Sequence, residues 1–183
     1  MSERDFDGLA RIEQVTGLGM ISVRGTLTDA GFQAAVVAAT GVSVPDRGTV
    51  STGAGRTVAW MSSDEILVVC AEADAKGIVD ALNAGLAGTH HMVTDVSDAR
   101  AVFRISGGAA RDVLAKVCPV DLRPNMFKAG QFRRTRMAQV ACAFWAEDET
   151  AFSLIGFRSV QDYIWDVLTT VASRDAPVDH FAS

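Results

Sequence analysis

The chain has 183 residues, with 17 Lys and Arg residues against 22 Asp and Glu residues, and a formal net charge of −5. Hydrophobic residues make up 49% of the chain, which is enough for a buried core and excludes a disordered chain. The acidic balance excludes a dedicated nucleic-acid binder, because such proteins need surplus Lys and Arg to neutralise phosphates. Composition therefore predicts a globular α/β or α+β protein.

Targeting and redox features point to the cytoplasm. No apolar run approaches the roughly 20 residues that a membrane-spanning helix needs. Residues 1–8 lack the apolar core of a signal peptide. The three cysteines, Cys70, Cys118 and Cys142, are odd in number and widely spaced, which favours reduced thiols over a disulfide framework. We expect a cytoplasmic protein that binds neither membranes nor nucleic acid.

Residues 1–16 carry several charges and are predicted to be a polar lead. From residue 17, apolar periodicity and turn residues predict an ordered series of elements. In chain order these are a strand at 20–24, a helix between Asp29 and Gly41, a mobile glycine-rich loop at 48–55, strands at 57–61 and 65–70, and a helix at 75–86.

The second half of the chain predicts the same order again. Its elements are a strand at 102–105, a helix at 108–117, strands at 131–137, 139–145 and 151–157, and a helix from Ser159 onward. Residue patterns also recur: Ile21–Gly25 is echoed by Phe103–Gly107, and Trp60 by Trp145, at a nearly constant separation. Such an echo indicates an internal duplication.

We therefore predict an α+β fold of tandem β-α-β-β-α, ferredoxin-like repeats with pseudo-twofold symmetry. Residues 17–172 are expected to form a single α+β domain built of two repeats, about 17–90 and 91–172. Two packed repeats can cover the sheet faces that one alone leaves open. Residues 173–183 are expected to be a polar C-terminal tail.

Common catalytic signatures are missing from the sequence, which has no nucleophile elbow, phosphate loop or Cys-x-x-Cys pair. His90 and His91, with Asp95 and Asp98 close behind, are the one cluster that suggests a metal. Neighbouring strand residues point to opposite faces, however, so the two imidazoles do not converge on one ion. We expect no catalytic, cofactor-binding or metal-binding residues in this chain.

The segment from Asp95 to Arg100 is denser in polar groups than a simple connection requires. One interpretation is a loop between the repeats that orients a ligand. The other is a structural junction, in which Asp95, Asp98 and Arg100 form an internal Asp–Arg pair with Asx-turn hydrogen bonds. We favour the structural junction.

Two features are candidate partner contacts. Arg133, Arg134 and Arg136 form a basic patch on an acidic chain, and they fit equally well a solvated strand edge or a docking surface for an acidic partner. Trp165 lies off the apolar stripe that Ile164 and Leu168 form on the last helix. A large aromatic in such a position is typical of an interface anchor.

Several segments together resemble the gamma subunit of heterotetrameric sarcosine oxidase. Residues 90–107, HHMVTDVSDARAVFRISG, are similar to its central signature. Further similar segments are 16–21, the hairpin at 60–69, AARDVLAK at 109–116, CPVDL at 118–122, and 157–166.

The resemblance implies a non-catalytic subunit that assists assembly of a four-subunit oxidoreductase. Such an enzyme oxidatively demethylates sarcosine to glycine, with formaldehyde or methylenetetrahydrofolate and hydrogen peroxide as products. It implies alpha, beta and delta partner subunits, which would hold FAD, FMN, NAD, tetrahydrofolate and zinc, with no cofactor in this chain. It also implies a fold similar to the folate-binding domain of glycine-cleavage aminomethyltransferases.

That kinship supplies an alternative, a free-standing folate-binding protein of the aminomethyltransferase-like superfamily. Its members enclose folate within a ring of three domains, and 183 residues leave room for one. Whether the isolated chain is itself an enzyme stays open at this point, since the resemblance brings no catalytic residue with it.

Overall fold

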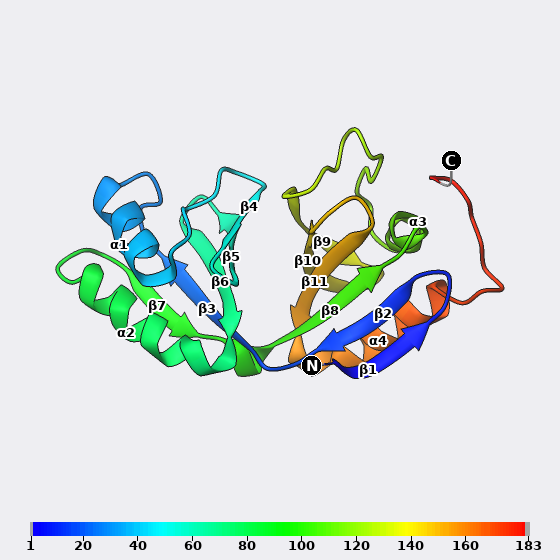
Figure 1. The fold of residues 1–183 in the computed structure, drawn as a ribbon, viewed down its shortest axis with the longest axis horizontal. Coiled ribbons are helices and arrows are strands. Elements are labelled where there is room, and N and C mark those ends of the chain that lie inside the picture. Colours follow the sequence, from blue (N-terminus) through cyan, green and yellow to red (C-terminus); the bar gives the residue numbers. More distant parts are fainter. Residues whose placement is uncertain (1, 182–183) are drawn as a thin grey trace. The chain divides into compact units, whose positions relative to one another are not determined.

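The computed structural model describes residues 2–181, which form two compact units (Figure 1). We call residues Gly17–Asp98 the central unit. The split unit combines Met1–Thr16 with Ala99–Ser183. Among residues 2–181, no helix is long and apolar enough to span a membrane.

The central unit is a five-stranded antiparallel sheet with two helices. Its elements are β3 (Leu18–Arg24), α1 (Ala30–Thr40), β4 (Val50–Gly53), β5 (Arg56–Ser62), β6 (Glu65–Ala71), a 3₁₀ turn (Glu72–Asp74), α2 (Ala75–Gly85) and β7 (Met92–Asp95). The strands lie in the order β4-β5-β6-β3-β7. Within it, β5-β6-β3-β7 has the strand order of a ferredoxin-like β-α-β-β-α-β unit, and β4 is an added edge strand.

Both helices of the central unit pack on one face of its sheet. Alternate strand residues such as Val23 and Val68 are fully buried there, against Val36 of α1 and Leu82 of α2. Period-two alternation in the strands and helical spacing in α1 and α2 supply these apolar faces. The apolar residues of the strands and of both helices thus form one core in this unit.

The split unit has a six-stranded antiparallel sheet. Its elements are β1 (Ser2–Asp7), β2 (Arg11–Val15), a 3₁₀ turn (Ser97–Ala99) that leads into it, β8 (Arg100–Ser106), α3 (Ala110–Ala115), β9 (Phe132–Met137), β10 (Val140–Ala146), β11 (Ala151–Phe157), a 3₁₀ turn (Arg158–Val160) and α4 (Gln161–Val171). The strand order is β1-β2-β8-β11-β10-β9. Phe127, Phe144 and Phe152 stack at the centre of its core, with ring centroids 5.2 to 6.5 Å apart.

The two units share one topology. In chain order β3, α1, β4, β5, β6 and α2 correspond to β8, α3, β9, β10, β11 and α4, and the sheets place these strands in the same order. β7 pairs with β3 and β2 pairs with β8, so each sheet includes the strand that precedes the other repeat in the chain. The duplicated α+β fold class is confirmed, while the pseudo-twofold relation stays a prediction.

The predicted polar lead is wrong. Residues 1–16 instead contribute β1 and β2, and Ile12 of β2 is fully buried in the split-unit core. The charges of this segment are used in ion pairs: Arg11 pairs with Asp5 at 2.7 Å, and Arg4 pairs with Asp162 of α4 at 2.8 Å. The unit boundaries accordingly fall at 16/17 and 98/99, and not at 90/91.

The glycine-rich loop at 48–55 is also not the loop we expected, because it contains β4. Ala54 and Gly55 have φ angles of 50° and 72°, which closes a tight hairpin between β4 and β5. Positive φ at both central positions is the geometry of a two-residue turn that matches the strand twist.

The predicted C-terminal tail packs on α3 through residues 173–181, and residues 182–183 lie outside the described part. The buried Asp112 carboxylate accepts hydrogen bonds from the backbone N–H groups of His180 and Phe181, at 3.2 Å each. Lys116 Nζ donates to the carbonyls of Val171 and Ala176. These contacts hold the tail over α3.

Candidate functional site

Trp165 is a half-buried residue of α4 that packs against the split-unit core. The Arg4 guanidinium of β1 lies 5.8 Å from its ring centroid, and Arg4 also pairs with Asp162 at 2.8 Å. One side of the ring therefore contacts the protein itself. Its proposed role as a partner contact remains a prediction.

The three arginines of the basic patch project from β9, the end strand of the split-unit sheet, and all three are exposed. Arg133 Nη1 donates to the carbonyl of Phe132 at 3.0 Å, and its guanidinium lies 5.9 Å from the Phe127 ring. Arg134 and Arg136 pair in register with Ala143 and Ala141 of β10. The patch thus lines a sheet edge.

The polar segment after β7 contains a tight Asx-type turn. Asp95 Oδ1 accepts hydrogen bonds from the backbone N–H and the hydroxyl of Ser97, whose Oγ accepts from the N–H of Met20 at 2.9 Å. The chain passes from the central to the split unit directly after Asp98. The Arg100 guanidinium lies over the ring of Phe157, at 4.3 Å.

Within residues 2–181, His, Cys, Asp and Glu side chains form no group of three that could hold a metal ion. His91 Nδ1 contacts the carbonyl of Thr89 at 3.0 Å, and its Nε2 lies 3.4 Å from Asn83 Oδ1. All three cysteines are buried. A hydrogen bond with Cys142, together with burial, raises the pKa of the Cys118 thiol, which keeps that sulfur protonated.

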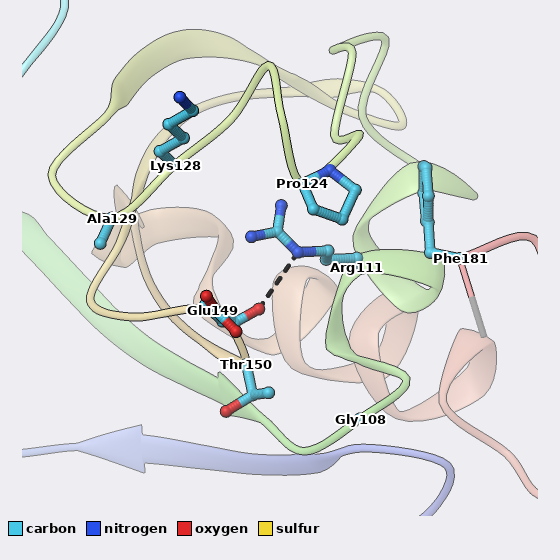
Figure 2. A pocket seen from close by; sticks show the side chains of 8 residues that line it. All are labelled: Gly108, Arg111, Pro124, Lys128, Ala129, Glu149, Thr150 and Phe181. Atoms are coloured by element: carbon cyan, nitrogen blue, oxygen red, sulfur yellow. Dashed lines mark hydrogen bonds between the residues drawn. The ribbon is translucent and has the colours of Figure 1, made fainter. Parts of the chain in front are cut away.

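The split unit also contains a pocket that the sequence analysis did not anticipate (Figure 2). Its volume is about 520 Å³, within the range of small-molecule sites. Its walls come from the start of α3, the loop before β9, the β10–β11 turn and the tail, through Gly108, Arg111, Pro124, Lys128, Ala129, Glu149, Thr150 and Phe181.

Arg111 is the buried charge of this pocket, with 6% of its surface exposed. Its Nη1 donates to the carbonyls of Leu122 and Phe127 at 2.8 and 2.9 Å, and its Nε donates to the carbonyl of Glu149 at 3.1 Å. The guanidinium also lies 5.2 Å from the ring of Phe152. Arg111 therefore ties the loop and the turn to α3, and Figure 2 shows its guanidinium between them.

The electrostatics of Arg111 are unusual for an arginine. Burial lowers its pKa, because a charged group loses hydration in the interior, and the Glu149 carboxylate partly offsets this effect. Within the described part of the chain no carboxylate forms an ion pair with Arg111. Its partners are backbone carbonyls and a ring, which leave its positive charge without a counter-ion.

The turn that carries Glu149 is held locally. Asp148 Oδ1 accepts hydrogen bonds from the backbone N–H of Thr150 at 2.7 Å and from its hydroxyl at 3.1 Å. The Thr150 carbonyl in turn accepts from the N–H of Gly107 at 3.0 Å. These hydrogen bonds fix the β10–β11 turn to the segment that precedes α3. The sequence signal was a pair of charged residues, Arg111 and Asp112, in the otherwise apolar helix α3.

Residues 2–181 thus define a protein of two ferredoxin-like repeats, with exposed arginines along the β9 edge and a pocket beside α3. Solved structures below 25% identity share this fold alone. Aminomethyltransferase T of the glycine cleavage system from Bartonella henselae matches 85% of this chain and 44% of its own, with a TM-score of 0.58 and 13% identity. The regulatory subunit of aspartate kinase from Thermus thermophilus matches with a TM-score of 0.52 and 12% identity.

More specific similarity identifies the family. Residues 24–174 match the sarcosine oxidase, gamma subunit family. The subunit gamma of sarcosine oxidase from an Arthrobacter species is 31% identical over 85% of this chain and 76% of its own length. That from Corynebacterium sp. strain U-96 is 32% identical over 85% and 74%. The chain belongs to the sarcosine oxidase gamma subunit family.

A structural match agrees with this assignment. A chain in heterotetrameric sarcosine oxidase from Corynebacterium sp. U-96 superposes with a TM-score of 0.84 and 27% identity. The match covers 95% of this chain and 90% of that chain. The resemblance noted in the sequence is therefore confirmed over nearly the whole fold.

Proposed function

We propose that this chain is the non-catalytic gamma subunit of a heterotetrameric sarcosine oxidase and acts in its assembly. The supporting observation is the match of 95% of the chain to a chain within such a complex, including both units. A role in assembly requires no chemistry in this chain itself.

The remaining expectations form part of this proposal. The partners are alpha, beta and delta subunits, and the whole complex demethylates sarcosine in the cytoplasm. The partners hold FAD, FMN, NAD, tetrahydrofolate and zinc.

Native mass spectrometry on the tagged chain, purified from its own host, tests the proposal. We expect a complex of four different subunits, much heavier than the 19.4 kDa of this chain, with flavin absorption in the same sample. A colourless chain that stays free would contradict it. Saturable folate binding by that free chain would then support the folate-binding alternative.

The basic patch on β9 is our first proposed partner contact. Reversing its charge with Arg134→Glu should slow association and make it less sensitive to salt, since electrostatic steering acts mainly on the association rate. Lys76→Glu reverses a charge on α2 of the central unit, where the exposed Lys76 side chain pairs with Asp80 at 2.7 Å, and serves as the control. Stopped-flow association kinetics that are equal for the two variants would remove β9 from the contact surface.

Trp165 is the second proposed contact. We expect Trp165→Ala to weaken assembly by about thirtyfold or more, because truncating a tryptophan that acts as an interface hot spot costs about 2 kcal/mol or more. Titration of the subunits followed by size-exclusion chromatography measures the change. Circular dichroism of the isolated variant is the control, and a variant that unfolds while assembly of its folded fraction is normal would assign the ring to the core.

A further inference from the structure

The pocket beside α3 contains an unsatisfied donor on a buried cation. Arg111 uses Nε and Nη1 for three backbone carbonyls, and Nη2 has no hydrogen-bond partner among residues 2–181. In the described chain, no atom of Arg111 is among the side-chain nitrogens and oxygens that are both unpaired and fully buried. The unpaired Nη2 of Arg111 is therefore accessible from outside the protein interior. It therefore faces the pocket that Arg111 lines.

A buried guanidinium without a counter-ion favours an anion in its vicinity. Removing a charge from water costs free energy that neutral carbonyls recover only in part, and a carboxylate can recover the rest through a charge-assisted hydrogen bond. Arg111 and Lys128 contribute two positive charges to the lining and Glu149 one negative charge. One negative charge on a ligand neutralises this set, whereas a polyanion would meet repulsion from Glu149.

Part of the lining is apolar and suited to a short hydrocarbon group. Pro124, Ala129 and the ring of Phe181 form walls on either side of Arg111 (Figure 2). The pocket volume of about 520 Å³ is ample for a molecule of six or so heavy atoms beyond its carboxylate. Charge and shape together specify the ligand class.

We propose that this pocket binds a small monocarboxylate with an apolar tail, whose carboxylate accepts a hydrogen bond from Arg111 Nη2. Its apolar tail lies along Pro124 and Phe181. All residues that line the site belong to the split unit.

Three probes that share one 3-methylbutyl tail test the proposal on the 183-residue chain by NMR titration. They are 4-methylpentanoate, its neutral amide 4-methylpentanamide, and the cation 3-methylbutylammonium. We expect saturable shifts of the Gly108 and Thr150 amides with the carboxylate. The amide should bind at least about tenfold more weakly, because a hydrogen bond to a charged group is lost. Equal binding of the amide, or no saturable shift with the carboxylate, would overturn the proposal.

A pocket-filling variant separates this site from others. A Cβ at Gly108 meets no atom within 4 Å, and its φ is not in the left-handed region, so Gly108→Leu can fill the pocket without backbone strain. Gly77 of α2 is equally open, and Gly77→Leu is the matched control in the central unit. We expect Gly108→Leu to abolish carboxylate binding while its circular dichroism stays native, and Gly77→Leu to bind normally. Native-folded Gly108→Leu that still binds would place the ligand elsewhere.

Discussion

Asp121 and Arg123 form a side-chain pair where the chain leaves α3 for the loop over the pocket. Arg123 Nε donates to both carboxylate oxygens of Asp121, at 2.9 and 3.1 Å. This hydrogen bonding lowers the pKa of Asp121 to about 2 from a usual value near 3.8. Because the folded pKa is depressed, the pair stabilises the chain above the unfolded pKa and loses this effect as the pH falls toward 2.

The Asp121 carboxyl resonance should therefore titrate near pH 2 in the folded chain, as measured by carbon-detected NMR. In the variant Arg123→Ala the pKa should return toward about 3.9. Asp148 provides an internal control, because hydrogen bonds from Thr150 lower its pKa and do not involve Arg123. An Asp121 pKa that is unchanged by Arg123→Ala would mean that the pair does not form in solution.

Arg111 shows why the role of a single residue is difficult to predict from the sequence. Its carbonyl partners, at Leu122, Phe127 and Glu149, come from three positions that no local pattern connects. An arginine in a short apolar helix indicates only that its charge needs partners, and it does not indicate which ones. The pocket follows from where those partners bring the loop and the turn.

Among the elements, helix α1 could be predicted from the sequence because the residues that begin and end it are local to it. Asp29 accepts a hydrogen bond from the N–H of Phe32 at 2.8 Å, and Gly41 ends the helix with a φ of 71°. Helix α4 begins without such a local signal, since its N-cap residue Val160 makes no side-chain capping hydrogen bond. Asp162 pairs instead with Arg4 of β1, more than 150 residues away in the chain, at 2.8 Å. Strand β2 was missed similarly, since its partner β8 is distant.

A close approach between β11 and α4 gives a prediction at this scale. A Cβ at Gly156 would lie 2.3 Å from Cδ1 of Ile164, which is fully buried. Gly156→Ala should therefore lower the free energy of unfolding by about 1–3 kcal/mol, because a packed core cannot easily absorb an added methyl group. Urea-induced unfolding of the chain measures the loss.

A second substitution checks the stated cause. Ile164→Val removes the clashing Cδ1 at its own cost of about 0.5–1.5 kcal/mol. In that background Gly156→Ala should cost less than it does alone, which a double-mutant cycle detects as a coupling energy. Strictly additive costs would show that the loss comes from the strand itself and not from contact with α4.

At the scale of the whole molecule, the two units differ in how the chain builds them. The sheet of the central unit consists of strands from 18 to 95 and needs nothing before residue 17. The sheet of the split unit joins two separate stretches of the chain, because β2 pairs with β8 along Arg11–Val15. The internal echoes predicted the repeat, but they could not show that each repeat pairs with the strand preceding the other.

This difference predicts the effect of removing residues 1–16. The deletion leaves β8 without β2, and it takes Ala10 and the fully buried Ile12 out of the split-unit core. The loss of Ile12 alone should cost about 2–5 kcal/mol. We expect amides of β8 and β11 to lose protection from hydrogen exchange, while amides of β3 and β6 keep theirs.

A synthetic peptide of residues 1–16 should restore protection in β8, whereas the same peptide with Ile12→Asp should not. Unaltered protection of β8 after the deletion would mean that β2 is dispensable, and the split unit would then be complete from residue 99 onward.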